Sequence, residues 1–203
     1  MKIKGLLFFL CITGAIFAEA QEIKLPEPQK QGGEPLMLAL SKRATTRNFD
    51  TQRAIEPQSL SNLLWAAWGY NREDKRTAPS AMNRQELTLY IITEQGAYSY
   101  DARQNRLCEI AAGDFRKSAG KQPFAQTAPL NIIFVADLDK APGNDMMFVD
   151  CGFVSQNIYL YCASAGLGTV VRGSFDGDEL AKVLKLNERQ KVLLTQSVGY
   201  PAQ

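Results

Sequence analysis

Apolar residues recur at helical spacing in two segments near the start of the chain. Pro35 suits the first position of a helix, and Leu36, Leu40 and their neighbours predict a short helix that ends near Lys42. A second helix is predicted from Pro57, because apolar side chains follow at i, i+3, i+4, i+7 and i+8 and a glycine then ends the pattern. These positions are Leu60, Leu63, Leu64, Ala67 and Trp68, with Gly69 as the stop.

Short apolar runs bounded by turn residues predict strands further along the chain. A turn at Gly96 and a polar cluster at residues 101–105 separate three of these runs, which is typical of a meander. The run LNIIFVA is apolar throughout and suits the centre of a sheet. The expected strands are residues 87–93, 97–100, 106–110, 130–136 and 192–198.

The longest apolar segment predicts a helix over residues 146–165, which Asp145 caps and Gly166 and Gly168 end. Its apolar residues lie on more than one side, and a helix of this kind is buried on both faces. We therefore expect the second face to meet another subunit. The apolar positions include Phe148, Val149, Phe153, Val154, Ile158, Leu160 and Tyr161.

A further helix is expected to run to Leu184, because Asp176 and Glu179 have the spacing of a capping box. Helices and strands thus interleave along the chain, with some strands paired as hairpins. This order predicts an α+β domain around a mixed sheet.

The first twenty residues have the composition of a secretory signal peptide. Lys2 and Lys4 precede an apolar stretch, and an Ala-Glu-Ala sequence places the cleavage site after Ala20. The apolar stretch is shorter than the roughly 20 residues that span a membrane. We expect a secreted or periplasmic protein without stable membrane association, with a polar linker at residues 21–33 and one folded domain at residues 34–203.

Charge and composition exclude several classes of function. Cleavage would remove two lysines and one glutamate from 23 basic and 21 acidic residues, and the resulting net charge near +1 gives no reason to expect a nucleic-acid partner. The chain has no histidine, which excludes Ser-His-Asp and Cys-His triads. Cys108, Cys151 and Cys162 lack zinc spacing, so no metal is expected. On one helix, Cys151 and Cys162 would lie about 16 Å apart, too far for a disulfide.

Three segments carry polar groups or glycines suited to binding a ligand. SKRATTRNF, residues 41–49, sets two arginines around a pair of threonines and could bind phosphate, although such a pair is usually a solvated surface. TAPSAMNRQE, residues 77–86, presents two amide side chains, but its composition also suits an ordinary polar loop. GLGTVVRGSFD, residues 166–176, has glycines that permit close backbone approach or simply end a helix.

The motifs in this order resemble the FMN-dependent nitroreductase family. They are R-x-T-x-R-x-F, P-S-A-x-N-x-Q, then D-x-G-x-x-x-Q-N in the long helix, G-L-G-T, and V-G-Y-P near the end. The resemblance covers the chain from Glu34, and residues 63–86, 97–107 and 127–138 look most like the branch of azoline-oxidising dehydrogenases that form thiazoles and oxazoles. It implies a nitroreductase-like fold, with a mixed or antiparallel central sheet surrounded by helices and a long buried central helix at a homodimer interface.

The same resemblance implies FMN as cofactor, in a site made by two subunits. The flavin ring exchanges hydride and electrons itself, so no residue is assigned a catalytic role. The phosphate and ribityl chain would be held by Arg43, Ala44, Thr45 and Arg47. The ring edge would meet Pro79, Ser80, Ala81, Asn83 and Gln85, and the other side of the ring would meet Val171, Arg172 and Gly173, with a backbone N–H near the reactive nitrogen.

The implied function is an exported oxidoreductase that moves hydride or two electrons between a small-molecule donor and an organic acceptor, such as a nitroaromatic, a quinone or an azoline. Two features depart from the family pattern. Many members continue into a C-terminal arm with a basic phosphate contact, which here is missing or replaced by Arg172 or Arg84. Gly173 and Ser174 stand where some members carry an acidic residue. The alternatives are a flavin-binding protein without turnover and a fold that has lost its flavin.

Overall fold

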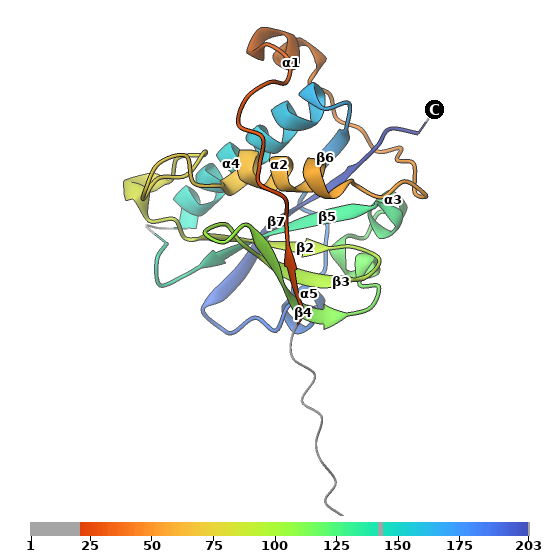
Figure 1. Cartoon of the computed structure of the whole chain (residues 1–203). Helices are drawn as coiled ribbons and strands as arrows, with labels where there is room; N and C mark the ends of the chain where they lie inside the picture. Colours follow the sequence, from red (N-terminus) through yellow and green to blue (C-terminus); the bar gives the residue numbers. More distant parts are fainter. Residues whose placement is uncertain (1–20, 142–143, 203) are drawn as a thin grey trace, which may run out of the picture.

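The computed structural model describes residues 21–141 and 144–202. The expected signal peptide, residues 1–20, therefore lies outside the described residues. The described chain forms a seven-stranded sheet with helices on both faces (Figure 1). None of its helices combines the length and apolar character needed to cross a membrane.

The strands form one sheet in the order β1-β4-β3-β2-β5-β7-β6. All pairings in this sheet are antiparallel, so the α+β class is confirmed. The mixed sheet predicted from the order of the elements is wrong, and the antiparallel alternative that the family resemblance implies is the one observed. The strands are β1 Glu22–Lys24, β2 Leu87–Ile92, β3 Gly96–Asp101, β4 Arg106–Ala112, β5 Leu130–Asp137, β6 Gly168–Arg172 and β7 Gln190–Gly199.

The helices largely follow the sequence prediction. The helix of Asp176 is confirmed, because its side chain accepts a hydrogen bond from the Glu179 backbone at 3.1 Å. The long helix begins at Asn144, so Asp145 lies in its first turn and the prediction of a cap at Asp145 is wrong. The α-helices are α1 Leu36–Lys42, α2 Pro57–Trp68, α3 Pro123–Thr127, α4 Asn144–Ser164 and α5 Gly177–Val183.

Both edge strands were missed by the sequence prediction. Strand β1 lies inside the expected linker and pairs with β4, and Leu25 behind it is buried, so this part of residues 21–33 belongs to the folded domain. Strand β6 occupies a segment interpreted as a glycine-containing loop, although its β-branched centre, Thr169 to Val171, favours a strand. Both strands depend on partners distant in sequence, which local patterning does not reveal.

The remainder of the expected linker is a strap that crosses α2 and leads to α1 (Figure 1). The Gln29 backbone donates to the Asn62 side chain of α2 at 2.7 Å. The Glu34 backbone donates to the Ser164 hydroxyl at the end of α4 at 2.8 Å. The strap thereby fixes where α1 starts, and with it the loop that follows α1.

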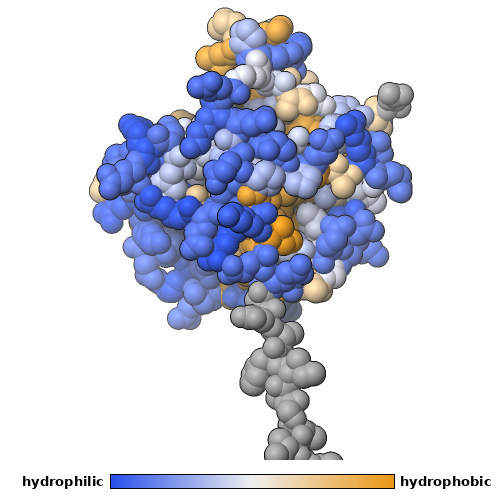
Figure 2. All heavy atoms as spheres, in the orientation of Figure 1, coloured by the Kyte–Doolittle hydropathy of each residue, from blue (hydrophilic) through white to orange (hydrophobic). Residues whose placement is uncertain are grey.

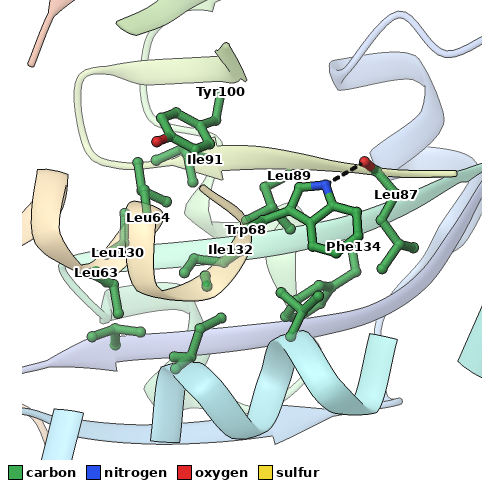
Figure 3. Close-up of a cluster of buried hydrophobic side chains, with 14 of the residues drawn as sticks. Leu63, Leu64, Trp68, Leu87, Leu89, Ile91, Tyr100, Leu130, Ile132 and Phe134 are labelled. Atoms are coloured by element: carbon green, nitrogen blue, oxygen red, sulfur yellow. Dashed lines mark hydrogen bonds between the residues drawn. The ribbon is translucent and has the colours of Figure 1, made fainter. Parts of the chain in front are cut away.

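Alternating side chains of the central strands build a core on each face of the sheet. On β5, Ile132 and Phe134 face α2 and α4, whereas Ile133 and Val135 face α5. Trp68 closes the first core, with its indole N–H donating to the Leu87 carbonyl at 2.9 Å (Figure 3). This contact ties α2 to the start of β2, directly after the polar loop of residues 77–86.

Helix α4 has one buried face and one exposed apolar face. Buried positions such as Cys151 and Ile158 pack on the sheet. Phe148, Val149 and Phe153 remain more than 40% exposed on the opposite side. Helix α1 also exposes large apolar side chains, and these form an orange patch at the top of Figure 2. These exposed residues are Leu36, Met37, Leu38 and Leu40.

Candidate functional site

The first and third candidate segments, residues 41–49 and 166–176, lie against each other in the folded chain. The Thr46 backbone N–H donates to the Thr169 carbonyl of β6 at 3.0 Å. A Cβ at Gly168 would lie 2.7 Å from Thr46, so a glycine is required for this approach. The loop after α1 and strand β6 therefore form one continuous surface.

Tyr159 of α4 joins these two segments, and the sequence interpretation did not identify it. Its hydroxyl accepts a hydrogen bond from the Val171 backbone N–H at 3.1 Å and lies 3.3 Å from the Thr45 hydroxyl. The Arg43 guanidinium lies over its ring, 5.4 Å from the centroid. Because the Val171 N–H is occupied by Tyr159, the expected backbone N–H beside a ligand would have to come from Arg172 or Gly173.

Two cations remain available on the loop after α1. Arg43 is half-buried beside Tyr159, and Arg47 is exposed. Among the described residues, neither arginine has a carboxylate within ion-pairing distance. Together with the exposed Ala44 and Thr45, they form a positively charged loop that suits a phosphate.

The side chain of Arg172 lies in the protein interior instead. Its guanidinium donates to the Ala119 carbonyl at 3.1 Å, the Asn131 side chain at 2.9 Å and the Ser197 hydroxyl at 2.9 Å. Burial among these neutral acceptors lowers the pKa of Arg172 to about 10. Arg172 therefore does not replace a phosphate contact from a C-terminal arm, and only its backbone can take part in a site beside β6.

The second segment lies elsewhere in the same chain. Its Ala81 backbone N–H donates to the Asp150 carboxylate at 2.8 Å, near the start of α4. Asp150 and Tyr159 are nine residues apart on one helix, which places them about 13 Å apart along its axis. A single chain therefore keeps the loop of residues 79–85 apart from the Arg43 and β6 surface.

Within this loop, one of the two predicted amides is already engaged. The Gln85 side chain donates to the Asp74 carbonyl at 2.6 Å and to Asn83 at 3.0 Å, and it accepts from Arg76 at 2.9 Å. Its amide is thus saturated by the loop itself and does not suit a ligand-reading role. Asn83 is exposed, and among the described residues its side-chain N–H₂ donates only to the Asp74 carbonyl, at a long 3.4 Å, while its side-chain oxygen accepts from Gln85.

The loop backbone is also strained. Met82, Asn83 and Gln85 have positive φ angles of 54°, 55° and 49°. Left-handed residues of this kind cost free energy and persist only where surrounding contacts hold them, often at functional sites. Pro79 and Met82 are exposed at the tip, whereas Ser80 accepts from the Gln85 backbone N–H at 3.0 Å and closes the loop.

The surface beside β6 can accommodate a flat ligand. Gly173 directly follows β6 and is exposed, and a Cβ there would have only Leu194 near it, at 4.0 Å. The open space at Gly173, at one end of β6, and the arginines of the loop that meets the other end at Gly168 suit a planar ring that carries a phosphate tail. The donor set contains no histidine and no acidic base, so chemistry at this place would come from a bound group.

Comparison with known proteins assigns the family. The model described as Nitroreductase family matches residues 40–200 of this chain. The chain belongs to the nitroreductase family. The match includes the loop after α1, the loop of residues 79–85 and strand β6, so the three segments recognised in the sequence all lie within the family domain.

Individual relatives agree with this assignment. A Ralstonia eutropha protein assigned as a nitroreductase has a crystal structure with a TM-score of 0.84 and 38% identity, covering 99% of this chain and 97% of its own. MJ1384 of Methanocaldococcus jannaschii, also assigned as a nitroreductase, is 28% identical over 87% of this chain and 96% of its own. The FMN reductase [NAD(P)H] of Bacillus subtilis is 28% identical over 81% of this chain and 65% of its own.

A more distant likeness concerns the azoline-oxidising branch. A chain of the microcin synthetase complex McbBCD of E. coli shares the nitroreductase fold with a TM-score of 0.69 at 15% identity. That likeness covers 89% of this chain and 79% of the other, and it extends to the fold alone. The family assignment supports an oxidoreductase.

Proposed function

We propose that this protein is an FMN-dependent oxidoreductase that moves hydride or two electrons between a small-molecule donor and an organic acceptor. The observation that carries the proposal is a pair of cations, Arg43 and Arg47, that have no carboxylate partner among the described residues and lie on the loop that packs against strand β6, which ends at the open backbone of Gly173. The name of the Bacillus subtilis relative, an FMN reductase, supports the choice of flavin.

Each part of the surface has a defined task in this proposal. Arg43, Arg47 and the Thr45 hydroxyl bind the phosphate and the adjoining chain, while Gly173 admits the ring to the backbone. Tyr159 links the arginine loop to strand β6, because its hydroxyl contacts both the Thr45 hydroxyl and the Val171 N–H. When bound, the flavin supplies the redox chemistry through its own ring, so the protein needs to bind it and to select which molecules approach.

We also propose that two copies of the chain complete the site. The loop of residues 79–85 lies apart from the Arg43 surface in one chain, and a two-fold axis along the outer face of α4 would bring the loop of one copy toward β6 of the other. The apolar residues exposed on α1 and α4 would be covered in that dimer. Gly152 supports close packing there, because nothing lies within 4 Å of its Cβ position.

The proposed setting is outside the cytoplasm, on the strength of the signal-like residues 1–20. Nitroaromatics, quinones and azolines are the proposed classes of acceptor or substrate, because an open flavin face accepts flat organic molecules. The electron donor would then be a reduced small molecule that is present outside the cytoplasm.

The deciding experiment is the visible spectrum of the purified protein. We expect a yellow protein with the absorption of oxidised flavin, whose cofactor after denaturation is FMN. Dithionite should bleach it and a quinone should restore the colour. A colourless protein that gains no flavin spectrum when mixed with FMN would contradict the proposal, and a bound flavin that no acceptor reoxidises would indicate a carrier.

Replacing Tyr159 with phenylalanine is expected to weaken FMN binding about tenfold. The change keeps the ring under Arg43 but leaves the Val171 N–H without its acceptor, a loss worth roughly 1 to 3 kcal/mol. The affinity is measured by fluorescence quenching of FMN on the flavin-free protein.

The matched control is Tyr161→Phe, which removes a hydroxyl from the same helix. The Tyr161 hydroxyl donates to the Ser59 carbonyl at 3.2 Å, on the α2 side of α4. Equal FMN affinities for the two variants would show that Tyr159 contributes only to stability.

A further inference from the structure

Two acidic side chains are buried beneath the loop of residues 79–85. Glu86 is 1% exposed and Asp150 is fully buried. One Asp150 oxygen accepts the Ala81 backbone N–H, at 2.8 Å. The other Asp150 oxygen and both Glu86 oxygens have no donor among the described residues. Buried carboxylates usually have several donors, so this arrangement requires an explanation.

No cation in the described chain compensates the two acids with an ion pair. On α4, the neighbouring charge-bearing groups are Asp150 and the buried thiol of Cys151. On β5, the Asp137 backbone donates to the Glu86 carbonyl at 2.9 Å. The nearby Arg76 is directed instead at Gln85 and at the α2 carbonyl of Trp68.

A shared proton resolves the arrangement. Two adjacent carboxyl groups in an apolar region resist double ionisation, because desolvation and mutual repulsion both disfavour the second charge. Burial and the neighbouring Asp150 raise the pKa of Glu86 to about 7. A protonated Glu86 can donate to the Asp150 carboxyl group, whose other oxygen accepts the Ala81 N–H.

We propose that Glu86 and Asp150 share one proton and that this proton holds the loop of residues 79–85 against α4. The loop is anchored at both ends by the pair, since Ala81 binds Asp150 and Gln85 precedes Glu86 directly. The three left-handed residues between these anchors need such support. Loss of the proton to solvent drives ionised Glu86 toward water, and the strained loop is released with it.

Glu86 and Asp150 are therefore positioning residues that make the loop pH-sensitive. If the loop contacts the flavin of a partner chain, FMN binding weakens above neutral pH, and this clause alone rests on the proposed function. The tests below use no flavin, so their failure and the failure of the proposed function are distinguishable.

The first test is tryptic cleavage after Arg84, which is exposed on the loop. The rate for the full chain is divided by the rate for Glu86→Gln at each pH, which cancels the pH dependence of the protease. Between pH 6 and pH 8.5 the ionised fraction of Glu86 rises about tenfold, and the rate ratio should rise by a similar factor. A constant ratio would overturn the proposal.

The control variant is Asp137→Asn, which alters an acid on the neighbouring strand but leaves the pair intact. It should retain the full pH dependence of cleavage. Asp150→Asn removes the neighbouring charge and should move the midpoint of the pH dependence to lower pH. An unchanged midpoint in Asp150→Asn would show that the two acids do not share a proton.

A measurement on the unmodified chain covers the case in which a variant fails to fold. The Ala81 amide resonance should titrate with a midpoint near pH 7, and a resonance that does not move would contradict the shared proton. The free energy of unfolding of the whole chain should also depend on pH. Because folded Glu86 binds its proton more tightly than unfolded Glu86, the free energy of unfolding falls as pH rises from about 4.5 to about 7 and then levels. In Glu86→Gln this fall should be absent.

Discussion

Replacing Phe153 with glutamate is expected to convert the proposed dimer into a monomer and to release bound FMN. Phe153 is 43% exposed on the outer face of α4, so a glutamate there remains solvated in a single chain and the fold should survive. In the dimer the same side chain would place an unpaired charge in an apolar interface, at a cost of several kcal/mol in each copy. The cofactor should be lost because each site would lose the loop of residues 79–85 from its partner.

Gel filtration measures both effects in one experiment, because light scattering gives the mass of the eluted protein and its visible absorbance gives the bound FMN. Gln95→Glu is the matched control, since it adds the same charge at an exposed turn between β2 and β3. Phe153→Leu, which keeps an apolar side chain, should retain the dimer and the colour. A Phe153→Glu monomer that holds FMN stoichiometrically would show that each site belongs to one chain, and the two-chain site would have to be abandoned.

The joint replacement of Arg43 and Arg47 by alanine is expected to weaken FMN binding by at least tenfold and to leave riboflavin binding little changed. Charge-assisted hydrogen bonds to phosphate are each worth roughly 1.5 to 3 kcal/mol, and riboflavin has no phosphate to lose. Because neither arginine pairs with a described carboxylate, the double replacement leaves no acid without its partner. A change in affinity can therefore be attributed to the ligand.

Arg53→Ala is a suitable control for this experiment. Arg53 is also exposed and lies over a tyrosine ring, 3.4 Å from the centroid of Tyr200, outside the proposed phosphate loop. Arg84→Ala tests whether the partner's loop supplies an additional phosphate contact, since the Arg172 side chain is confined to the interior. An equal loss of FMN and riboflavin in the double variant would place the phosphate elsewhere.

Much of the fold was predictable because its elements are encoded locally. The helix from Pro57 ends at Trp68 with Gly69 as its cap, as the apolar spacing predicts. The cap at Asp176 is set by residues three positions apart. The edge strands were not predictable in this way, because Ile23 pairs with Leu107 and Val170 with Ser197, and neither partner is near in sequence.

The candidate site shows the same division. The charge of the arginine loop and the missing side chain at Gly173 could be read from the sequence, because they are properties of the residues themselves, and the roles of these residues stay predictions. The role of Tyr159 could not be predicted from the sequence, because it is one of many large side chains in a long, mostly apolar helix. Its importance arises only when the loop after α1 and strand β6 meet over its hydroxyl.

By itself the sequence determined the order of the main strands and of the helices other than α3, the three segments suited to binding a ligand, and the resemblance to the nitroreductase family. Only the tertiary structure decided which polar groups remain free to bind. Arg76 occupies the Gln85 amide, Tyr159 occupies the Val171 N–H, and Asn131 holds Arg172 in the interior. The physical reason is that a hydrogen-bonding group is available only if no other part of the chain satisfies it, and in the last two cases the partner comes from a segment distant in sequence.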